Sequence, residues 1–157
     1  MTKSWRDQQL AWFNEPVIIQ QDQELIDYIQ HNHIQSAKIH GDDGYFSTYV
    51  SAVDDCKVDF IIWIENQLFD FADLVIRINH ELQTTLNHNG VLYLAVNKFL
   101  CQPGCYDTDL LDNYDDAITQ YLNKHIDAEL TQALPDYNTT GDRFYWAHPL
   151  TRFYFKK

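Results

Sequence analysis

Two apolar runs on either side of a helical pattern constrain the fold of this chain more than any other feature. Residues 58–65 (VDFIIWIE) and 91–100 (VLYLAVNKFL) are apolar at adjacent positions, so both faces of each run need to be buried. A strand that is apolar on both faces is expected in the interior of a sheet. Between the runs, apolar residues recur at spacings of three and four from Leu68 to Leu86, which predicts a helix ended by a left-handed cap at Asn89-Gly90.

Further elements are expected before this unit. Asp22 is a suitable N-cap for a first helix that ends near His31 and buries the apolar residues between 25 and 29. Two strands are expected at 37–40 and 45–53. The turn 41–44 (GDDG) between them is typical of a hairpin connection.

The C-terminal third predicts one more helix and an aromatic hairpin. Apolar residues recur at helical spacing from Leu111 to Leu134, and Pro135 is expected to end that helix. The segments 143–148 and 151–156 are rich in aromatic residues and predict a closing β-hairpin.

Together these elements predict one globular α+β domain over residues 1–157. The expected architecture is a mixed or antiparallel sheet of about five to six strands with about three helices packed on it. An apolar content of 45% with only five glycines, and the absence of repeats or linkers, supports a single packed domain. The strand order does not follow from the sequence.

The chain is expected to be cytoplasmic and to have no membrane partner. It has no apolar run of the length that a membrane span needs, and its first residues lack the apolar stretch of a signal peptide. The cysteines Cys56, Cys101 and Cys105 are an odd number, which favours reduced thiols.

Negative charge is the most informative global feature. The chain has 23 acidic and 11 basic residues, for a formal net charge of -12. All 23 acids lie between Asp7 and Asp142, where only five basic residues oppose them, so this stretch carries a formal charge of -18. Such a surface repels nucleic acid and anionic membranes and attracts basic proteins, although high negative charge can also serve solubility alone.

Several of these carboxylates are candidates for a partner-binding surface. They lie in predicted turns and strand ends, or in the cluster 107–116 at the start of the last helix, where some can also cap the helix and complement its dipole. If folding gathers them on one side, they form a broad anionic face. The predicted partner-binding residues are Asp42, Asp43, Asp54, Asp55, Asp107, Asp109, Asp112, Asp115 and Asp116.

No motif in the sequence predicts a catalytic centre, a metal site or a cofactor. The pair Cys101 and Cys105 lacks the second pair of a zinc site, and the segment 107–116 lacks the glycine and glutamate of an EF-hand loop. Glycine-rich phosphate loops and the Gly-x-Ser-x-Gly nucleophile motif are also missing.

The leading hypothesis is therefore a non-enzymatic acidic protein that inhibits a basic partner protein. Within it, an immunity protein that neutralises a nuclease-type toxin is preferred to a phage-type anti-defence protein or nucleic-acid mimic. Two other classes stay open. One is a small enzyme whose site is assembled from dispersed residues such as His40, Asp59, Glu65, His80 and one cysteine. The other is a protein that self-assembles through the edge of its terminal hairpin.

Overall fold

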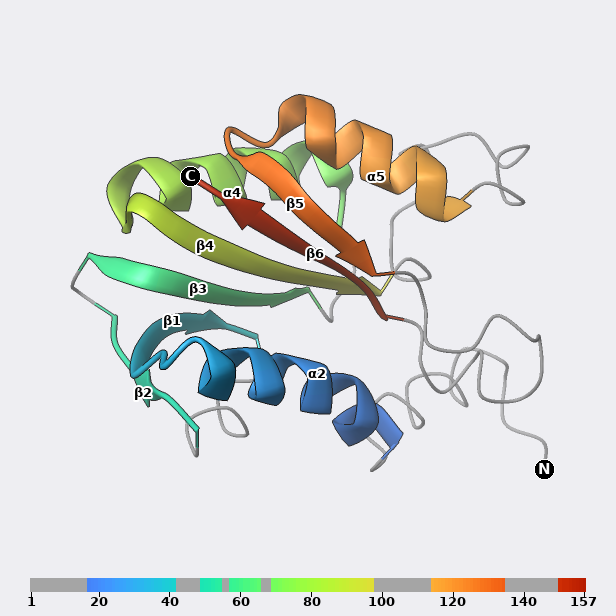
Figure 1. The fold of residues 1–157 in the computed structure, drawn as a ribbon. Helices are drawn as coiled ribbons and strands as arrows, with labels where there is room; N and C mark the ends of the chain where they lie inside the picture. Colours follow the sequence, from blue (N-terminus) through green and yellow to red (C-terminus); the bar gives the residue numbers. More distant parts are fainter. Residues whose placement is uncertain (1–16, 42–48, 55–56, 66–68, 98–113, 135–149) are drawn as a thin grey trace, which may run out of the picture.

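The fold is a mixed sheet between two layers of helices. The computed structural model describes residues 17–41, 49–54, 57–65, 69–97, 114–134 and 150–157. Helix α2 (Val17–His31) covers one face of the sheet, whereas α4 (Phe71–Thr84) and α5 (Tyr114–His125) cover the other (Figure 1). The α+β class, with three helices and six strands among the described residues, confirms the prediction.

The six strands are arranged in the order β2-β1-β3-β4-β6-β5. Their bounds are β1 Ser36–His40, β2 Ser51–Ala52, β3 Val58–Glu65, β4 Leu86–Asn97, β5 Glu129–Leu134 and β6 Leu150–Lys156. The neighbours from β2 to β4 are parallel, and β6 runs antiparallel to both β4 and β5. The two runs that are apolar on both faces, β3 and β4, lie at the centre of the sheet, as predicted.

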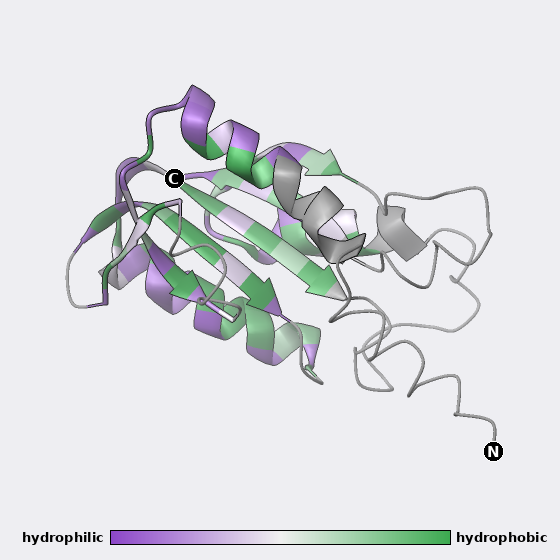
Figure 2. Cartoon of the chain, turned by 90° about the horizontal axis from the view of Figure 1, so that it is seen from below, coloured by the Kyte–Doolittle hydropathy of each residue, from purple (hydrophilic) through white to green (hydrophobic). Residues whose placement is uncertain are grey.

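Successive side chains of the central strands point to opposite faces of the sheet, so the hydrophobic core has one part on each face. In β3, Ile61 and Trp63 pack towards α4 and α5, whereas Phe60, Ile62 and Ile64 pack towards α2. The strands are accordingly the most continuously hydrophobic elements, and the helices combine hydrophobic and hydrophilic faces (Figure 2).

Strand β6 continues the same alternation near the C-terminus of the chain. Phe153 and Phe155 join the core under α4 and α5, and Tyr154 joins the core under α2. Lys157 donates from Nζ to the carbonyl oxygens of Leu82 and Leu86 at 2.6 and 2.8 Å, which satisfies acceptors in the last turn of α4 and at the start of β4. The terminal strand is therefore an integral part of the core.

The first helix and the hairpin after it differ from the predictions. Helix α2 includes Val17, so Asp22 lies inside it and is not its N-cap, although Leu25, Ile26 and Ile29 are buried as expected. Strand β1 pairs with β2 in parallel, and a tight hairpin can join only antiparallel strands. Residues 42–48, which include the first half of the predicted strand 45–53, lie outside the described residues; of the described part, 49–53, only Ser51–Ala52 is a strand.

The end of α4 also differs from the prediction. Its N-cap is Asp70, whose carboxylate accepts from the backbone N–H of Ala72 at 2.8 Å, and its C-cap is Thr85. Asn89 does adopt a left-handed conformation, with φ of 66°, but it lies within β4. There it accompanies an irregularity in the pairing of β4 with β3, so the Asn-Gly signal marks a distorted strand and not the end of a helix.

The C-terminal third contains the largest errors of prediction. The helix expected to extend to Leu134 ends at His125, and residues 129–134 form β5 instead. Leu130 and Leu134 have helical spacing but are only partly buried in an edge strand. Strand β6 corresponds to the second half of the predicted aromatic hairpin. It pairs with β4 on one side and with β5 on the other, so no free strand edge remains along 152–156 for the segment 143–148. That segment itself lies outside the described residues.

No helix within the described ranges is long and apolar enough to cross a membrane.

Candidate functional site

A polar hollow lies where the edge of α4 passes over β1 and β3. It has a volume of about 430 Å³ and is open to solvent. We call it the β1–α4 hollow. Its lining residues are His40, Trp63, Ile76, Arg77, His80 and Glu81.

The register of β1 explains why this face is polar. Ala37 and Ile39 pack into the core under α2, so the alternate residues Lys38 and His40 point to the opposite face, beside α4. Helix α4 presents Arg77 and Glu81 to them, four residues apart and thus on one side of the helix.

Trp63 is the floor of the hollow. Its indole Nε1 donates to Glu65 Oε2 at 3.0 Å, and the ring of His40 stacks on it with centroids 4.1 Å apart. The Arg77 guanidinium lies 5.6 Å from the indole centroid and donates to the same Glu65 oxygen at 3.2 Å. Arg77 also binds Asp73 at 3.0 Å, one helical turn away. A largely buried tryptophan thus holds both an imidazole and a guanidinium in place.

Glu81 links the two polar residues of β1. Lys38 Nζ donates to both carboxylate oxygens of Glu81, at 2.9 and 3.0 Å. His40 Nε2 lies 3.8 Å from Glu81 Oε1, too far for a hydrogen bond. Within the described part of the chain this nitrogen is buried and has no hydrogen-bond partner.

The protonation of His40 and Glu81 follows from burial and from these contacts. Burial is the largest effect on His40 and lowers its pKa, the charges of Lys38 and Arg77 lower it further, and those of Glu81 and Glu65 only partly oppose them. For Glu81, burial is also the largest single effect and would raise the pKa. Hydrogen bonds from Lys38 and Thr85, with the charges of Lys38 and His40, outweigh it and lower the pKa. The pair is therefore a neutral imidazole beside an ionised carboxylate.

The polar side chains around the hollow bind one another and do not have the arrangement of a reactive centre. Glu65 and Glu81 are each already bound by a cation, so neither is poised to accept a proton from a substrate. A neutral His40 could act as a base, but no serine, threonine or cysteine appears among the residues that line the hollow in the described structure.

The structure groups part of the dispersed set predicted for an enzyme. His40 and His80 line the β1–α4 hollow, and Glu65 is connected to it through Trp63 and Arg77. Asp59 is exposed at the start of β3 and accepts a hydrogen bond from Asn87 at 2.9 Å, away from the hollow. The three cysteines lie outside the described residues. Among the residues that the structure describes, no group of three histidine, cysteine, aspartate or glutamate side chains could hold a metal ion.

The predicted partner-binding carboxylates are only partly covered by the structure. Asp54 is exposed just after β2, and Asp115 and Asp116 lie in the first turn of α5. Whether the whole set forms one face stays a prediction, because the other members lie outside the described residues. These are Asp42, Asp43, Asp55, Asp107, Asp109 and Asp112.

The residues that organise the hollow are not among the predicted site residues. They are Lys38, Trp63, Arg77 and Glu81. Two signals for them were present. The segment 37–40 alternates apolar and polar residues, and Asp73, Arg77 and Glu81 are spaced by four along the predicted helix. What the sequence could not provide was the parallel pairing of β1 with β3, which places His40 opposite Trp63.

Comparison with models of protein families finds none that matches this chain, and a search of curated proteins finds no match either.

Replacing Lys38 by methionine is expected to raise the pKa of His40. The change removes a positive charge that lowers this pKa and leaves the negative charge of Glu81 without its main partner. In the wild type the folded-state pKa lies below the unfolded one. The stability from His40 is therefore present above the unfolded value and is lost as pH falls through the lower folded value. In the variant this loss on acidification should be smaller.

Proton NMR of the His40 ring between about pH 5 and about pH 8 measures the shift directly, and urea midpoints near the two ends of this range measure the linked stability. Lys57→Met is the matched control, because Lys57 is exposed at the start of β3 and is not among the groups that shift the pKa of His40. An unchanged or lowered pKa of His40 in Lys38→Met would show that Lys38 does not set its protonation.

Proposed function

We propose that this chain is a non-enzymatic inhibitor that binds a basic protein, in the manner of an immunity protein that neutralises a nuclease-type toxin. The observation that carries the proposal is the separation of charge between the interior and the exterior of the fold. Of the seven lysine and arginine residues whose side chains are described, three are bound by carboxylates, whereas seven of the ten described aspartate and glutamate side chains are exposed.

Three basic residues are bound by carboxylates of the fold. Lys38 is bound by Glu81, Arg77 by Glu65 and Asp73, and the buried Arg152 by Glu24. Each contact neutralises negative as well as positive charge, so the net charge of -12 is unchanged. The field felt by an approaching protein is therefore that of an acidic surface.

The exposed charges of the described side chains show the same imbalance. Seven exposed carboxylates face four exposed cations, one of which is Arg77, already bound by Glu65 and Asp73. The seven carboxylates belong to Asp27, Asp54, Asp59, Asp70, Asp73, Asp127 and Glu129, and the other three cations to Lys57, Lys124 and Lys156. They are spread over several elements, which favours long-range attraction of a basic protein as well as a local contact.

The mechanism of inhibition would be occlusion. A basic nuclease must expose a cationic cleft to bind the phosphates of nucleic acid, and an acidic protein that covers this cleft competes with the substrate. Electrostatic complementarity mainly accelerates association, and an interface of this class buries on the order of 1,600 Å². No reactive group on the inhibitor is needed.

The test is affinity capture from the native lysate with the tagged full chain, followed by association kinetics with the protein recovered. We expect one basic protein, whose association rate falls steeply as salt rises. Changing Asp54, Asp115 and Asp116 together to asparagine should slow association about tenfold at low salt and leave the dissociation rate nearly unchanged. An association rate that does not respond to ionic strength would refute the electrostatic mechanism, and failure to recover any basic protein would count against inhibition itself.

The enzyme alternative has one observation in its favour, the convergence of His40 and His80 on the β1–α4 hollow. It is the weaker candidate because the carboxylates beside them are bound by Lys38 and Arg77. The hollow is better explained as the polar edge of the packing between β1 and α4.

A further inference from the structure

The junction between α5 and β5 is bound by a side chain from another helix. The side-chain amide of Asn79, in α4, donates from Nδ2 to the carbonyl oxygen of His125 at 2.9 Å. Its Oδ1 accepts from the backbone N–H of Asp127 at 2.8 Å. Residues 126–128 form a bend there, and β5 begins at Glu129. One amide therefore binds the backbone on both sides of the point where the helix ends.

These two contacts take the place of hydrogen bonds that a longer helix would make. The N–H of Ile126 still binds the carbonyl oxygen of Leu122 at 2.9 Å, in the helical pattern. In a continuing helix the N–H of Asp127 and the carbonyl of His125 would be used in the same way, because each N–H binds the carbonyl four residues earlier. Asn79 occupies both groups. The end of α5 is therefore fixed by a tertiary contact.

The sequence across the junction favours a longer helix. Residues 126–134 contain neither glycine nor proline, and most of them are alanine, leucine, glutamate or glutamine, which are among the best helix formers. Strands favour β-branched and aromatic residues instead. Apolar residues also recur every four positions from Ile118 through the junction to Leu134. The local preference of this segment therefore conflicts with the strand that it forms.

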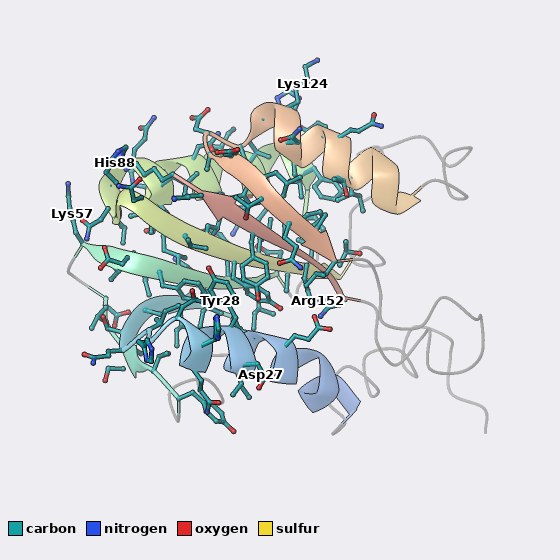
Figure 3. All side chains as sticks on the ribbon, in the orientation of Figure 1. Asp27, Tyr28, Lys57, His88, Lys124 and Arg152 are labelled. Carbon is teal, nitrogen blue, oxygen red and sulfur yellow. The ribbon has the colours of Figure 1, made fainter. Side chains whose placement is uncertain are left out.

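Strand β5 has little side-chain burial to oppose this preference. Most of its side chains are exposed, and only Leu130 and Leu134 are half-buried. Among the described strands β5 pairs with β6 alone, and this pairing is irregular between Leu130 and Gln132. Lys124, in the last turn of α5, is exposed and points away from the sheet (Figure 3). Elements with few buried contacts are those that open most readily.

We propose that residues 126–134 are a conformational switch between β5 and an extension of α5, and that Asn79 is the latch that selects the strand. Without the latch, the two backbone groups that it binds become available to helical partners within the segment. In the helical state Leu130 and Leu134 would continue the apolar stripe of α5. This inference does not depend on the proposed inhibition.

The two states differ in the strand edge that they expose. Release of β5 uncovers the outer edge of β6, whose backbone N–H and C=O groups can then pair with an extended segment of another protein. An uncovered edge beside the core residues Phe153 and Phe155 is unfavourable by itself. The strand is therefore the resting state, and binding of such a segment to β6 would favour the helix.

The test compares the full-length wild type with Asn79→Ala by relaxation-dispersion NMR, which detects minor conformers on the microsecond-to-millisecond timescale. The loss of two hydrogen bonds corresponds to roughly a tenfold change in a conformational ratio. We expect a minor conformer with helical Cα shifts at residues 128–133, and its ratio to the strand conformer should rise about tenfold in the variant. The amides of β6 that face β5 should exchange faster as well. Absence of a helical conformer from Asn79→Ala would overturn the proposal.

Asn87→Ala is the matched control for Asn79→Ala. Asn87 also donates from its side-chain amide at an exposed position, but its partner is Asp59 at 2.9 Å, away from the junction. This variant should leave the conformers of residues 126–134 as they are in the wild type. An equal rise of the helical conformer in both variants would show that Asn79 is not a specific latch.

A double variant, Asn79→Ala with Ala128→Gly, distinguishes a helical state from fraying of β5. Ala128 lies in the bend when β5 is formed, whereas an extended α5 would place it inside the helix. Glycine there should reduce the helical conformer about fivefold relative to Asn79→Ala alone. If the segment shows unfolded shifts in both variants, or if glycine has no effect on the minor conformer, β5 only frays and Asn79 is not a switch.

Discussion

Replacing Phe155 by alanine is expected to lower the free energy of unfolding by about 4 kcal/mol, the range of large-to-small changes in a closed core. Phe155 is fully buried in β6, in the core under α4 and α5, and lies beside Phe153. Because β6 is paired on both sides, the neighbouring strands cannot easily close over the cavity. Urea denaturation monitored by circular dichroism measures the loss.

Ile76→Ala is the matched control for Phe155→Ala. Ile76 is also a large apolar residue, but 68% of it is exposed on α4, so its truncation should change stability by less than about 0.5 kcal/mol. A loss of less than about 1 kcal/mol for Phe155→Ala would mean that β6 is not the core strand described above.

Alanine at Gly41 is expected to cost roughly 3 kcal/mol, from strain at a left-handed backbone position and from a steric clash. Gly41 follows β1 with φ of 99°, and a Cβ there would lie 2.3 Å from the carbonyl oxygen of Ile64 in β3. That oxygen belongs to the backbone of a central strand, so relief requires β1 and β3 to separate. Thermal and urea unfolding of the variant measure the cost, and displaced ring resonances of His40 would show that the β1–α4 hollow is disturbed as well.

Gly41→Asn distinguishes the two causes of this loss. Asparagine tolerates positive φ better than alanine does, yet it adds the same Cβ. If the clash with Ile64 dominates, both variants should lose similar stability. If backbone strain dominates, the asparagine variant should be clearly more stable than the alanine variant. A small effect of both changes would contradict the close approach of β1 to β3.

These stability predictions also bear on the β1–α4 hollow, because it is built between packed elements. The hollow requires β1 to stay in register with β3. A variant that separates these two strands would therefore disturb the contacts of His40 with Trp63 and Glu81 as well.

The sequence alone predicted the elements that have to be deeply buried. The runs at 58–65 and 91–97 are apolar on both faces, and only a central strand satisfies both faces at once. Likewise, the apolar stripe that includes Phe71, Val75, Ile78 and Leu82 has to be buried, and in the structure it packs in the core on one face of the sheet. The α+β class followed from these segments.

Local patterns failed where neighbours in space decide the conformation. Leu130 and Leu134 have the spacing of a helix, but β6 offers a free edge there, and backbone hydrogen bonds to it hold residues 129–134 as a strand. Asn89 adopts the left-handed conformation of a helix cap, but it does so in an irregular strand, where a Cβ at Gly90 would clash with Leu86. A single sequence does not reveal which edge is available.

The β1–α4 hollow was decided only by the tertiary structure. The net negative charge and the alternation of Ala37, Lys38 and Ile39 are properties of the sequence. The contact between Glu81 and His40 depends on the parallel register of β1 and β3. The ion pair between Glu24 and Arg152 joins residues that are 128 positions apart in the chain. Contacts of this kind are fixed by the packing of whole elements, because the pairing energy of two distant side chains is too small to select a fold by itself.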